Sequence, residues 1–275
     1  MKKHFRNICV ACAAVAALYA AASAAAKKTN NKEKNIDADN PYRGTNCNSK
    51  GGADEKCGNR GSMSAYEGTV KPVLDRVLSF GGLILLSPLF AAISAAIRID
   101  DPGPVFFTQK RIGKDKTYFL CHKFRTMKMS APHDVPTHQL EHPDQYITRV
   151  GRFLRKTSLD ELPQIWDIFR ARMSVIGPRP ALWNQDDLVE ERDKYGANDI
   201  LPGLTGWAQI KGRDELEIPD KAKLDGEYSS ILKNGGIDAL KMDIKCFIGT
   251  AFSVVRGDGV VEGGTGEIHK KGQKP

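Results

Sequence analysis

Aromatic residues make up only 8% of the 275-residue chain, and no motif typical of nucleic-acid-binding proteins is present. Six cysteines, at positions 9, 12, 47, 57, 121 and 246, show neither zinc-type spacing nor a general disulfide framework, apart from one Cys-x-x-Cys inside an apolar run. These absences argue against nucleic acid as a partner and against a metal–thiolate site.

Basic residues outnumber acidic ones by 41 to 33, which gives a formal net charge of +8. Such an excess suits an anionic membrane surface or phosphorylated small molecules. The length allows one domain of fair size together with appendages.

The N-terminal region predicts two appendages. Residues 1–26 indicate a signal-like or anchor segment, because a basic start is followed by an Ala-rich run with a small-residue cleavage pattern at Ala22-Ser23-Ala24. An uncleaved membrane helix is the alternative. Residues 27–69 predict a polar linker, either disordered or fused to the protein, in which Cys47 and Cys57 would form a disulfide if the segment is exported.

A second apolar run, from Val77 to Ile97, carries no charge and is long enough for the hydrocarbon core of a membrane. Proline inside a helix removes a backbone hydrogen bond and kinks the helix, so we expect a bend at Ser87-Pro88. The residues alone fit a kinked single pass and a re-entrant helix equally well.

The stretch from Val105 to Met127 predicts a β-hairpin that turns near Gly113. Side chains alternate along a strand, so Lys123 and Arg125 are expected on one face, where they would grip a diphosphate or simply be solvated on an edge strand. The following loop contains three histidines, at positions 133, 138 and 142, whose spacing favours a surface loop over a metal site.

Two adjacent carboxylates, Asp160 and Glu161, follow a basic run and precede Pro163, which the first turn of a helix tolerates. We therefore expect them at or near a helix N-terminus. Ser158 and Glu161 match a capping box, so capping is one explanation for these residues. A helix N-terminus also favours an incoming phosphate, and a carboxylate there is a possible nucleophile or ligand of a divalent metal.

Four further segments lie C-terminal to this acidic pair. Gly177-Pro178-Arg179-Pro180 forms a stiff turn that presents the Arg179 guanidinium, either to phosphate or to solvent. A Gly/Pro-rich loop with a tryptophan covers residues 201–209. Residues 240–255 show helical apolar spacing flanked by cations, which fits a helix on a membrane surface or one packed on the body. Residues 264–275 predict a polar tail.

Taken together and in this order, these segments resemble the monotopic phosphoglycosyl transferases, a bacterial sugar transferase family, over residues 70–263. The chain resembles a small, minimal member. The resemblance is carried by six stretches: Ser87-Pro88, Phe107–Gly113, Lys123–Met127, Ser158–Gln164, Met173–Pro180 and Pro202–Gln209.

The resemblance implies an α/β (α+β) fold: one membrane-associated catalytic domain with an N-terminal re-entrant helix, residues 77–97, and surface amphipathic helices. It implies transfer of a phosphosugar from a UDP-sugar to polyprenol phosphate, with release of UMP, on the cytoplasmic face of the bacterial inner membrane.

The resemblance also assigns roles to residues. Asp160 is expected to be the nucleophile, and Glu161 a base or metal ligand, the pair holding Mg²⁺. Arg155 and Arg179 are expected to bind phosphate, with Lys123 and Arg125 as further candidates. Ser87 and Pro88 are expected to shape the membrane helix. Two rivals remain: a membrane-anchored, non-catalytic protein that binds anionic lipid or nucleotide, and a glycosyl transferase that releases UDP.

Overall fold

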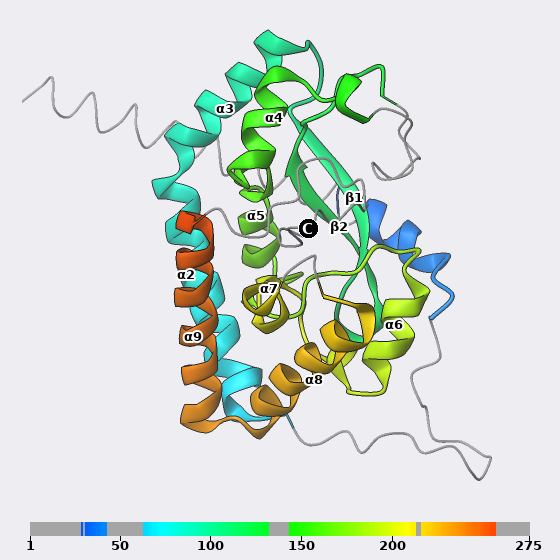
Figure 1. Ribbon diagram of the computed structural model, residues 1–275, viewed down its shortest axis with the longest axis vertical. Helices are drawn as coiled ribbons and strands as arrows, with labels where there is room; N and C mark the ends of the chain where they lie inside the picture. Colours follow the sequence, from blue (N-terminus) through cyan, green and yellow to red (C-terminus); the bar gives the residue numbers. More distant parts are fainter. Residues whose placement is uncertain (1–28, 30, 43–62, 132–142, 213–215, 257–275) are drawn as a thin grey trace, which may run out of the picture.

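The computed structural model describes residues 29, 31–42, 63–131, 143–212 and 216–256. These residues form a mixed helix and strand structure (Figure 1). The expectations for residues 1–26, for Cys47 and Cys57, for the three loop histidines and for the tail from residue 264 fall outside the described ranges. From residue 66 onward, the longer helices are η1 (Tyr66–Val70), α2 (Lys71–Leu85), α3 (Ser87–Asp100), α4 (Arg149–Lys156), α5 (Gln164–Phe169), α6 (Asp186–Asp193), α7 (Trp207–Lys211), α8 (Ile218–Asn234) and α9 (Gly236–Arg256).

The predicted hairpin is confirmed. Strand β1 (Phe106–Ile112) pairs antiparallel with β2 (Tyr118–Phe124) through a short 3-10 turn, η2 (Lys114–Lys116), in which Asp115 has a positive φ of 53°. Strand β2 is mostly buried because its side chains enter three core clusters, one with Leu154 of α4, one with Ile168 of α5 and one with residues of α6. The hairpin therefore ends beside the segment that carries the acidic pair.

A second, parallel pair brings two glycine-containing segments together. Strand β3 (Ser174–Ile176) pairs with β4 (Gly203–Thr205). The backbones are so close that a Cβ on Gly203 would lie 2.1 Å from the Gly177 nitrogen, and one on Gly206 would lie 2.2 Å from the Gly177 oxygen. Only glycine permits this approach, which fixes the turn that carries Arg179 against the start of α7.

Helices α2 and α3 contain the apolar run and are separated by a sharp break at Leu86. No single helix in the described ranges is both long and apolar enough to cross a membrane, but residues 66–85 and 87–100 pass that test as a pair bent by 60°. Pro88 cannot donate a hydrogen bond to the Ile84 carbonyl, four residues earlier. The Ser87 hydroxyl donates to that carbonyl instead, at 2.8 Å, so serine and proline together build the bend.

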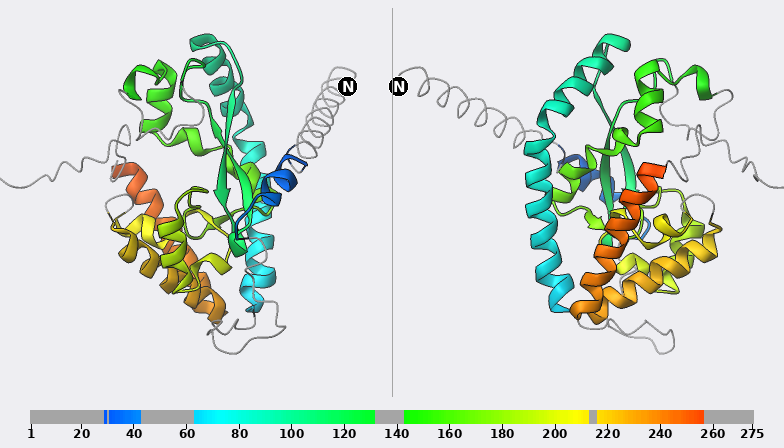
Figure 2. Two further views of the ribbon diagram at one scale, coloured as in Figure 1. Left: turned by 90° about the vertical axis from the view of Figure 1, so that its right-hand side faces the viewer. Right: turned by 60° about the vertical axis from the view of Figure 1, so that its left-hand side comes forward.

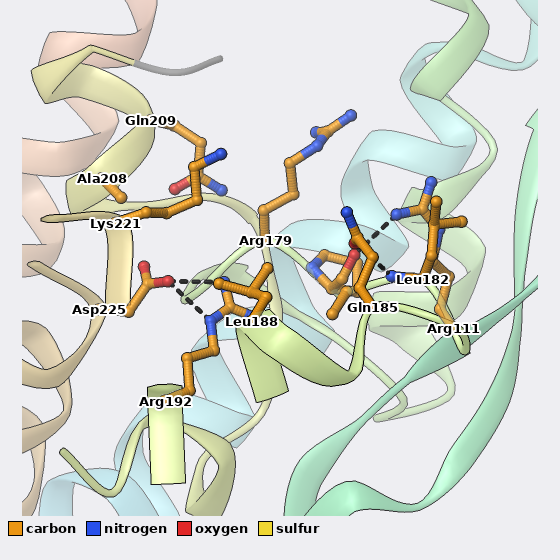
Figure 3. Close-up of a pocket in the computed structure, with 12 residues that line it drawn as sticks. Arg111, Arg179, Leu182, Gln185, Leu188, Arg192, Ala208, Gln209, Lys221 and Asp225 are labelled. Carbon is orange, nitrogen blue, oxygen red and sulfur yellow. Dashed lines mark hydrogen bonds and ion pairs between the residues drawn. The ribbon is translucent and has the colours of Figure 1, made fainter. Parts of the chain in front are cut away.

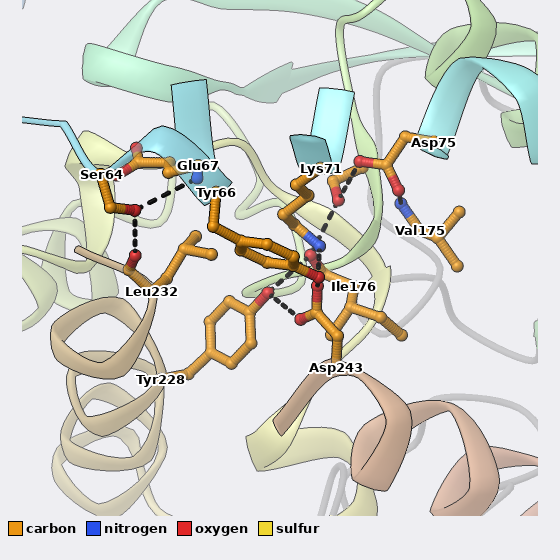
Figure 4. A network of polar contacts seen from close by, with 11 residues as sticks. Ser64, Tyr66, Glu67, Lys71, Asp75, Val175, Ile176, Tyr228, Leu232 and Asp243 are labelled. Carbon is orange, nitrogen blue, oxygen red and sulfur yellow. Dashed lines mark hydrogen bonds and ion pairs between the residues drawn. The ribbon is translucent and has the colours of Figure 1, made fainter. Parts of the chain in front are cut away.

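The start of α2 is attached to α8 and α9 by a buried polar cluster, which we call the helix clamp: Lys71, Asp243, Tyr66 and Tyr228 (Figure 4). Lys71 Nζ lies 2.7 Å from Asp243 Oδ2, and both tyrosine hydroxyls are bonded to the same carboxylate, at 2.8 and 2.6 Å. One turn further along α2, Asp75 accepts hydrogen bonds from the Ser174 hydroxyl and the Val175 amide of β3. The clamp and Asp75 thus hold α2 against α8, α9 and the strand that leads to Arg179.

Residues 31–38, within the range predicted as a polar linker, are helical and contact the body of the domain (Figure 2). Glu33 is buried beside Arg172, with 2.8 Å between Oε2 and Nη2. Asp37 accepts a hydrogen bond from the Tyr118 amide at 3.0 Å. Ile36 and Tyr42 pack against a cluster that includes Tyr118 and residues of α6.

Candidate active site

The acidic pair lies in a single 3-10 turn, η5 (Leu159–Glu161), directly before α5. Proximity to a helix N-terminus is as predicted, with Pro163 as the residue that precedes the first turn of α5. The predicted capping box is wrong. Ser158 adopts a left-handed conformation, with a φ of 55°, and its side chain makes no capping hydrogen bond. The Glu161 carboxylate instead forms ion pairs with cationic side chains from other elements.

Glu161 is held by two cations that come from different parts of the chain. Lys123 Nζ, from β2, lies 2.8 Å from Oε1. The Arg179 guanidinium makes two contacts, 2.5 Å to Oε1 and 3.1 Å to Oε2, in a bidentate arrangement. Burial raises the pKa of Glu161, but the charges and hydrogen bonds of Arg179 and Lys123 outweigh it and hold the pKa well below its ordinary value. Glu161 is therefore an anion at neutral pH.

Asp160 has a different environment, although it is the next residue. It is half-buried, and no lysine or arginine of the described chain forms an ion pair with it. Burial raises its pKa; the charge of Lys123 opposes this, neighbouring Glu161 adds to it, and Arg155 opposes it less strongly than Lys123. A partly desolvated carboxylate without a direct ion pair is a better nucleophile than one held by cations.

Arg155, near the end of α4, donates from Nε to the Thr126 hydroxyl at 2.9 Å and is close enough to Asp160 for their charges to interact. Gly151 allows helix α4 to pack closely against the backbone at Thr126, because a Cβ at this position would lie 2.1 Å from the Thr126 carbonyl oxygen. The structure thus gathers Lys123, Arg155 and Arg179 around Asp160 and Glu161. We call these five residues the carboxylate site.

Arg125 is not part of this group. Strand β2 ends at Phe124, and the Arg125 guanidinium, which is buried, contacts the side chain and carbonyl of Asp101 at the end of α3. Ser87 and Pro88 lie at the helix break, as expected of them. The role of Arg125 in substrate binding stays a prediction, and the contact with Asp101 gives it a structural function.

Sequence reasoning assigned no role to a pocket that adjoins the carboxylate site and has a volume of about 190 Å³ (Figure 3). Arg179 lies in its wall, so the pocket and the carboxylate site share one side chain. Its other polar walls include Arg111, Gln209 and Asp225. Arg111 and Gln209 fall inside stretches that carry the family resemblance, but only the folded chain places them around one cavity.

The donor set fits a magnesium ion bound chiefly by substrate phosphates. The described residues contain no cluster of three or more histidine, cysteine, aspartate or glutamate side chains suited to a metal. Magnesium in phosphoryl-transfer sites commonly takes only one or two carboxylates and keeps waters and substrate oxygens as its other ligands. Asp160 supplies one such carboxylate, which forms no ion pair within the described chain, whereas both oxygens of Glu161 already bind Lys123 or Arg179.

The sequence model of the bacterial sugar transferase family matches residues 66–257. The chain belongs to this family. It is 39% identical over 173 residues to an Escherichia coli UDP-glucose:undecaprenyl-phosphate glucose-1-phosphate transferase, a match that covers 60% of this chain and 37% of the relative.

Two relatives of more similar length come from rhizobia. The exopolysaccharide production protein ExoY of Rhizobium meliloti is 35% identical over 182 residues, 61% of this chain and 80% of the relative. The exopolysaccharide production protein PSS of Rhizobium leguminosarum is 34% identical over 199 residues, 69% of this chain and 98% of the relative. The chain spans about a third of the length of the larger transferases it matches.

Proposed function

We propose that the protein transfers a phosphosugar from a UDP-sugar to polyprenol phosphate and releases UMP. The observation that carries this proposal is the contrast within the acidic pair, in a chain of the bacterial sugar transferase family. Glu161 is held by Lys123 and Arg179, whereas Asp160 has no ion pair within the described chain and its pKa is raised. Larger relatives that act on UDP-glucose and undecaprenyl phosphate support the substrate classes.

In the first step an Asp160 carboxylate oxygen attacks the phosphorus that bears the sugar. The new oxygen–phosphorus bond forms as the bond to the UMP oxygen breaks, and UMP leaves with that electron pair. Arg179 and Arg155 hold phosphate oxygens, and Lys123 balances the negative charge that gathers beside Glu161. Splitting one difficult displacement into two easier ones is the advantage of a covalent intermediate.

In the second step a phosphate oxygen of polyprenol phosphate attacks the same phosphorus, and the bond to Asp160 breaks. The product is a polyprenol diphosphate sugar, and the carboxylate is regenerated. Glu161 stays ionised throughout and positions Lys123 and Arg179. A bound Mg²⁺ would neutralise part of the diphosphate charge, which lowers the repulsion of an approaching carboxylate.

We further propose that the bent pair α2–α3 is a re-entrant membrane helix and that α9 lies on the membrane surface. Helix α9 presents a run of exposed apolar side chains: Ile237, Leu240, Ile244, Phe247, Ile248 and Phe252. Helix α2 does the same, with Leu85 79% exposed next to the break. Exposed apolar surface of this extent marks an interaction with a membrane or a partner. A catalytic domain on the cytoplasmic face would meet both a soluble nucleotide sugar and a lipid carrier.

The decisive experiment mixes detergent-extracted protein with a UDP-sugar in the absence of acceptor. Wild type is expected to release up to one equivalent of UMP and to carry a phosphosugar adduct visible by intact mass spectrometry. Asp160→Asn should do neither, whereas Asp220→Asn, an exposed acid on α8, should behave as wild type. Adduct or UMP from Asp160→Asn would overturn the nucleophile. A second reaction then adds polyprenol phosphate. UDP in place of UMP in that reaction would indicate a glycosyl transferase, and no nucleotide at all a binding protein.

A further inference from the structure

The pocket beside the carboxylate site contains buried polar atoms that lack partners within the described chain. Both atoms of the Gln209 side-chain amide, Arg111 Nε and Asp225 Oδ1 are shielded from solvent and make no hydrogen bond there. Buried polar groups are nearly always paired, and leaving one unpaired is costly. Three such groups around one cavity indicate a polar ligand that completes them.

The positions of these groups divide the pocket. In Figure 3, Gln209, Lys221 and Asp225 stand on one side, Arg111 and Gln185 on the other, and Arg179 rises between them. Arg179 is also bonded to Glu161, so the Arg179 end adjoins the reacting phosphates. A ligand that begins at Arg179 and extends into the pocket therefore reaches Gln209 and Asp225 away from the chemistry.

The groups themselves specify the chemistry of that ligand. The Gln209 amide offers one acceptor and two donors, which matches a flat N–H and C=O pair such as the imide edge of uracil. Asp225 Oδ2 accepts hydrogen bonds from Arg192 Nη2 and Nε, at 2.6 and 2.9 Å, which leaves Oδ1 as an acceptor for a hydroxyl. Carboxylates bind ribose hydroxyls in this way in other nucleotide sites. Pro180, Leu182, Leu188 and Ala208 supply apolar walls.

Arg111 suits the phosphate end of such a ligand. Two of its nitrogens are occupied, Nη1 by the Pro180 carbonyl and Nη2 by Gln109 Oε1, at 2.8 and 2.9 Å. Burial lowers the pKa of the Arg111 guanidinium to about 10. A phosphate oxygen at Nε would compensate this desolvated cation.

We propose that this pocket binds the nucleoside of the UDP-sugar, with Gln209 reading the uracil base and Asp225 the ribose. The proposal rests on the proposed function for the identity of the nucleotide. It places the diphosphate at Arg179 and Arg111. The sugar then lies outside the pocket, beyond Asp160 as seen from Gln209. Enzymes of different sugar specificity would then share this end of the substrate.

The test measures binding of UMP, which has no sugar, to the full chain in detergent by calorimetry. Replacing Gln209 by leucine keeps the approximate volume and removes both hydrogen-bonding groups. We expect Gln209→Leu to weaken UMP binding about tenfold. Gln145→Leu, an exposed glutamine far along the chain from the pocket residues, is the matched control and should bind as wild type.

Changes in the ligand test the same contacts without altering the fold. A UMP analogue methylated at N3 lacks the N–H group that is proposed to donate a hydrogen bond to the Gln209 side-chain oxygen. Wild type should bind this analogue about tenfold more weakly than UMP, whereas Gln209→Leu should not distinguish the two. Deoxy-UMP, which lacks the 2′-hydroxyl, should bind wild type more weakly than UMP; equal binding would overturn the assignment of the ribose to Asp225.

Two results would overturn the base assignment: unchanged UMP binding in Gln209→Leu, or an effect of that variant confined to discrimination between UDP-glucose and UDP-N-acetylglucosamine. The second result would place the sugar, not the base, at Gln209. Release of UMP in the acceptor-free assay is measured on the same preparations. Wild type that binds UMP through Gln209 without releasing it from UDP-sugars would retain the nucleoside pocket and overturn the transfer.

Discussion

The helix clamp and the carboxylate site are built from the same kinds of groups and differ in what surrounds them. In each, a carboxylate is shared between a lysine and other donors. The clamp is closed: the side chains of Lys71 and Asp243 are only 7% and 11% exposed, and two tyrosine hydroxyls complete the carboxylate. The carboxylate site is open on one side, because the Arg179 side chain is 36% exposed and lies in the wall of a pocket.

This difference separates structure from function. In the clamp, the two charges are almost fully buried and paired with each other, so their main effect is to fix α2 against α8 and α9. In the carboxylate site, Arg179 is able to exchange part of its contact with Glu161 for a phosphate, because water and ligand reach it. The comparison predicts that damage to the clamp lowers stability first, whereas damage to the carboxylate site lowers activity first.

The largest effect is expected from Asp243→Ala. This variant leaves the Lys71 charge buried and unpaired, and removal of one member of a buried pair costs about 3–5 kcal/mol. The free energy of unfolding, measured with denaturant in detergent, should fall by that amount. Asp238→Ala on the same helix is the control, because its pair with Lys241 is 68% and 80% exposed and should contribute nothing measurable. Equal stability of the two variants would remove the distinction between the regions.

Glu161→Gln is expected to show the opposite pattern. Without the negative charge, Lys123 and Arg179 lose the group that positions them, and single-turnover UMP release should fall about 100-fold. The free energy of unfolding should fall by less than in Asp243→Ala, since glutamine still accepts hydrogen bonds from Lys123 and Arg179 and water reaches the Arg179 guanidinium. Glu190→Gln, an exposed residue of α6, is the control. A large loss of stability with normal turnover in the folded fraction would make Glu161 a structural residue.

A smaller effect is expected from Tyr228→Phe. The variant removes one hydroxyl from the clamp, 2.6 Å from Asp243 Oδ1, and leaves the Lys71 pair in place. We expect a loss of about 1–2 kcal/mol in the free energy of unfolding and unchanged turnover per folded molecule. Tyr195→Phe, at a residue that is 43% exposed, should change neither quantity. Reduced turnover at unchanged stability would show that the clamp reaches the chemistry.

Much of the frame was predictable from local patterns. Strand alternation and a central glycine predicted the hairpin, and a proline in an apolar run predicted the break at Ser87-Pro88, where the structure adds the hydrogen bond to Ile84. These features depend on residues close together in the chain. The acidic pair was recognised for the same reason, since its two members are adjacent.

The features that the sequence did not predict depend on contacts between residues that are far apart in the chain. Alternation placed Lys123 and Arg125 on one face, but β2 ends between them, and Asp101 draws Arg125 to the end of α3. The capping box failed because Lys123 and Arg179, distant in sequence, compete for Glu161. The pocket required the β3–β4 pairing to bring Arg179 beside Gln209. No local pattern contains these contacts.

The smallest effect we expect is a displacement of the pH profile rather than a loss. Asp160 must be ionised to attack phosphorus, so the rate of acceptor-free UMP release should fall as the pH drops through its raised pKa. Glu161 has a lowered pKa and stays ionised over that range, which leaves a single acid limb. Among the charges that lower the pKa of Asp160, Lys123 has the largest effect.

Lys123→Met should therefore move the acid limb of UMP release to higher pH, whatever it does to the maximal rate. Arg155→Met should move the limb in the same direction by less, because its charge has the weaker effect on Asp160. Lys128→Met removes an exposed lysine five residues further along the chain and should leave the midpoint unchanged. A midpoint that stays fixed in Lys123→Met, or moves to lower pH, would mean that a group other than Asp160 titrates. The carboxylate site would then lose the feature that distinguishes its two acids.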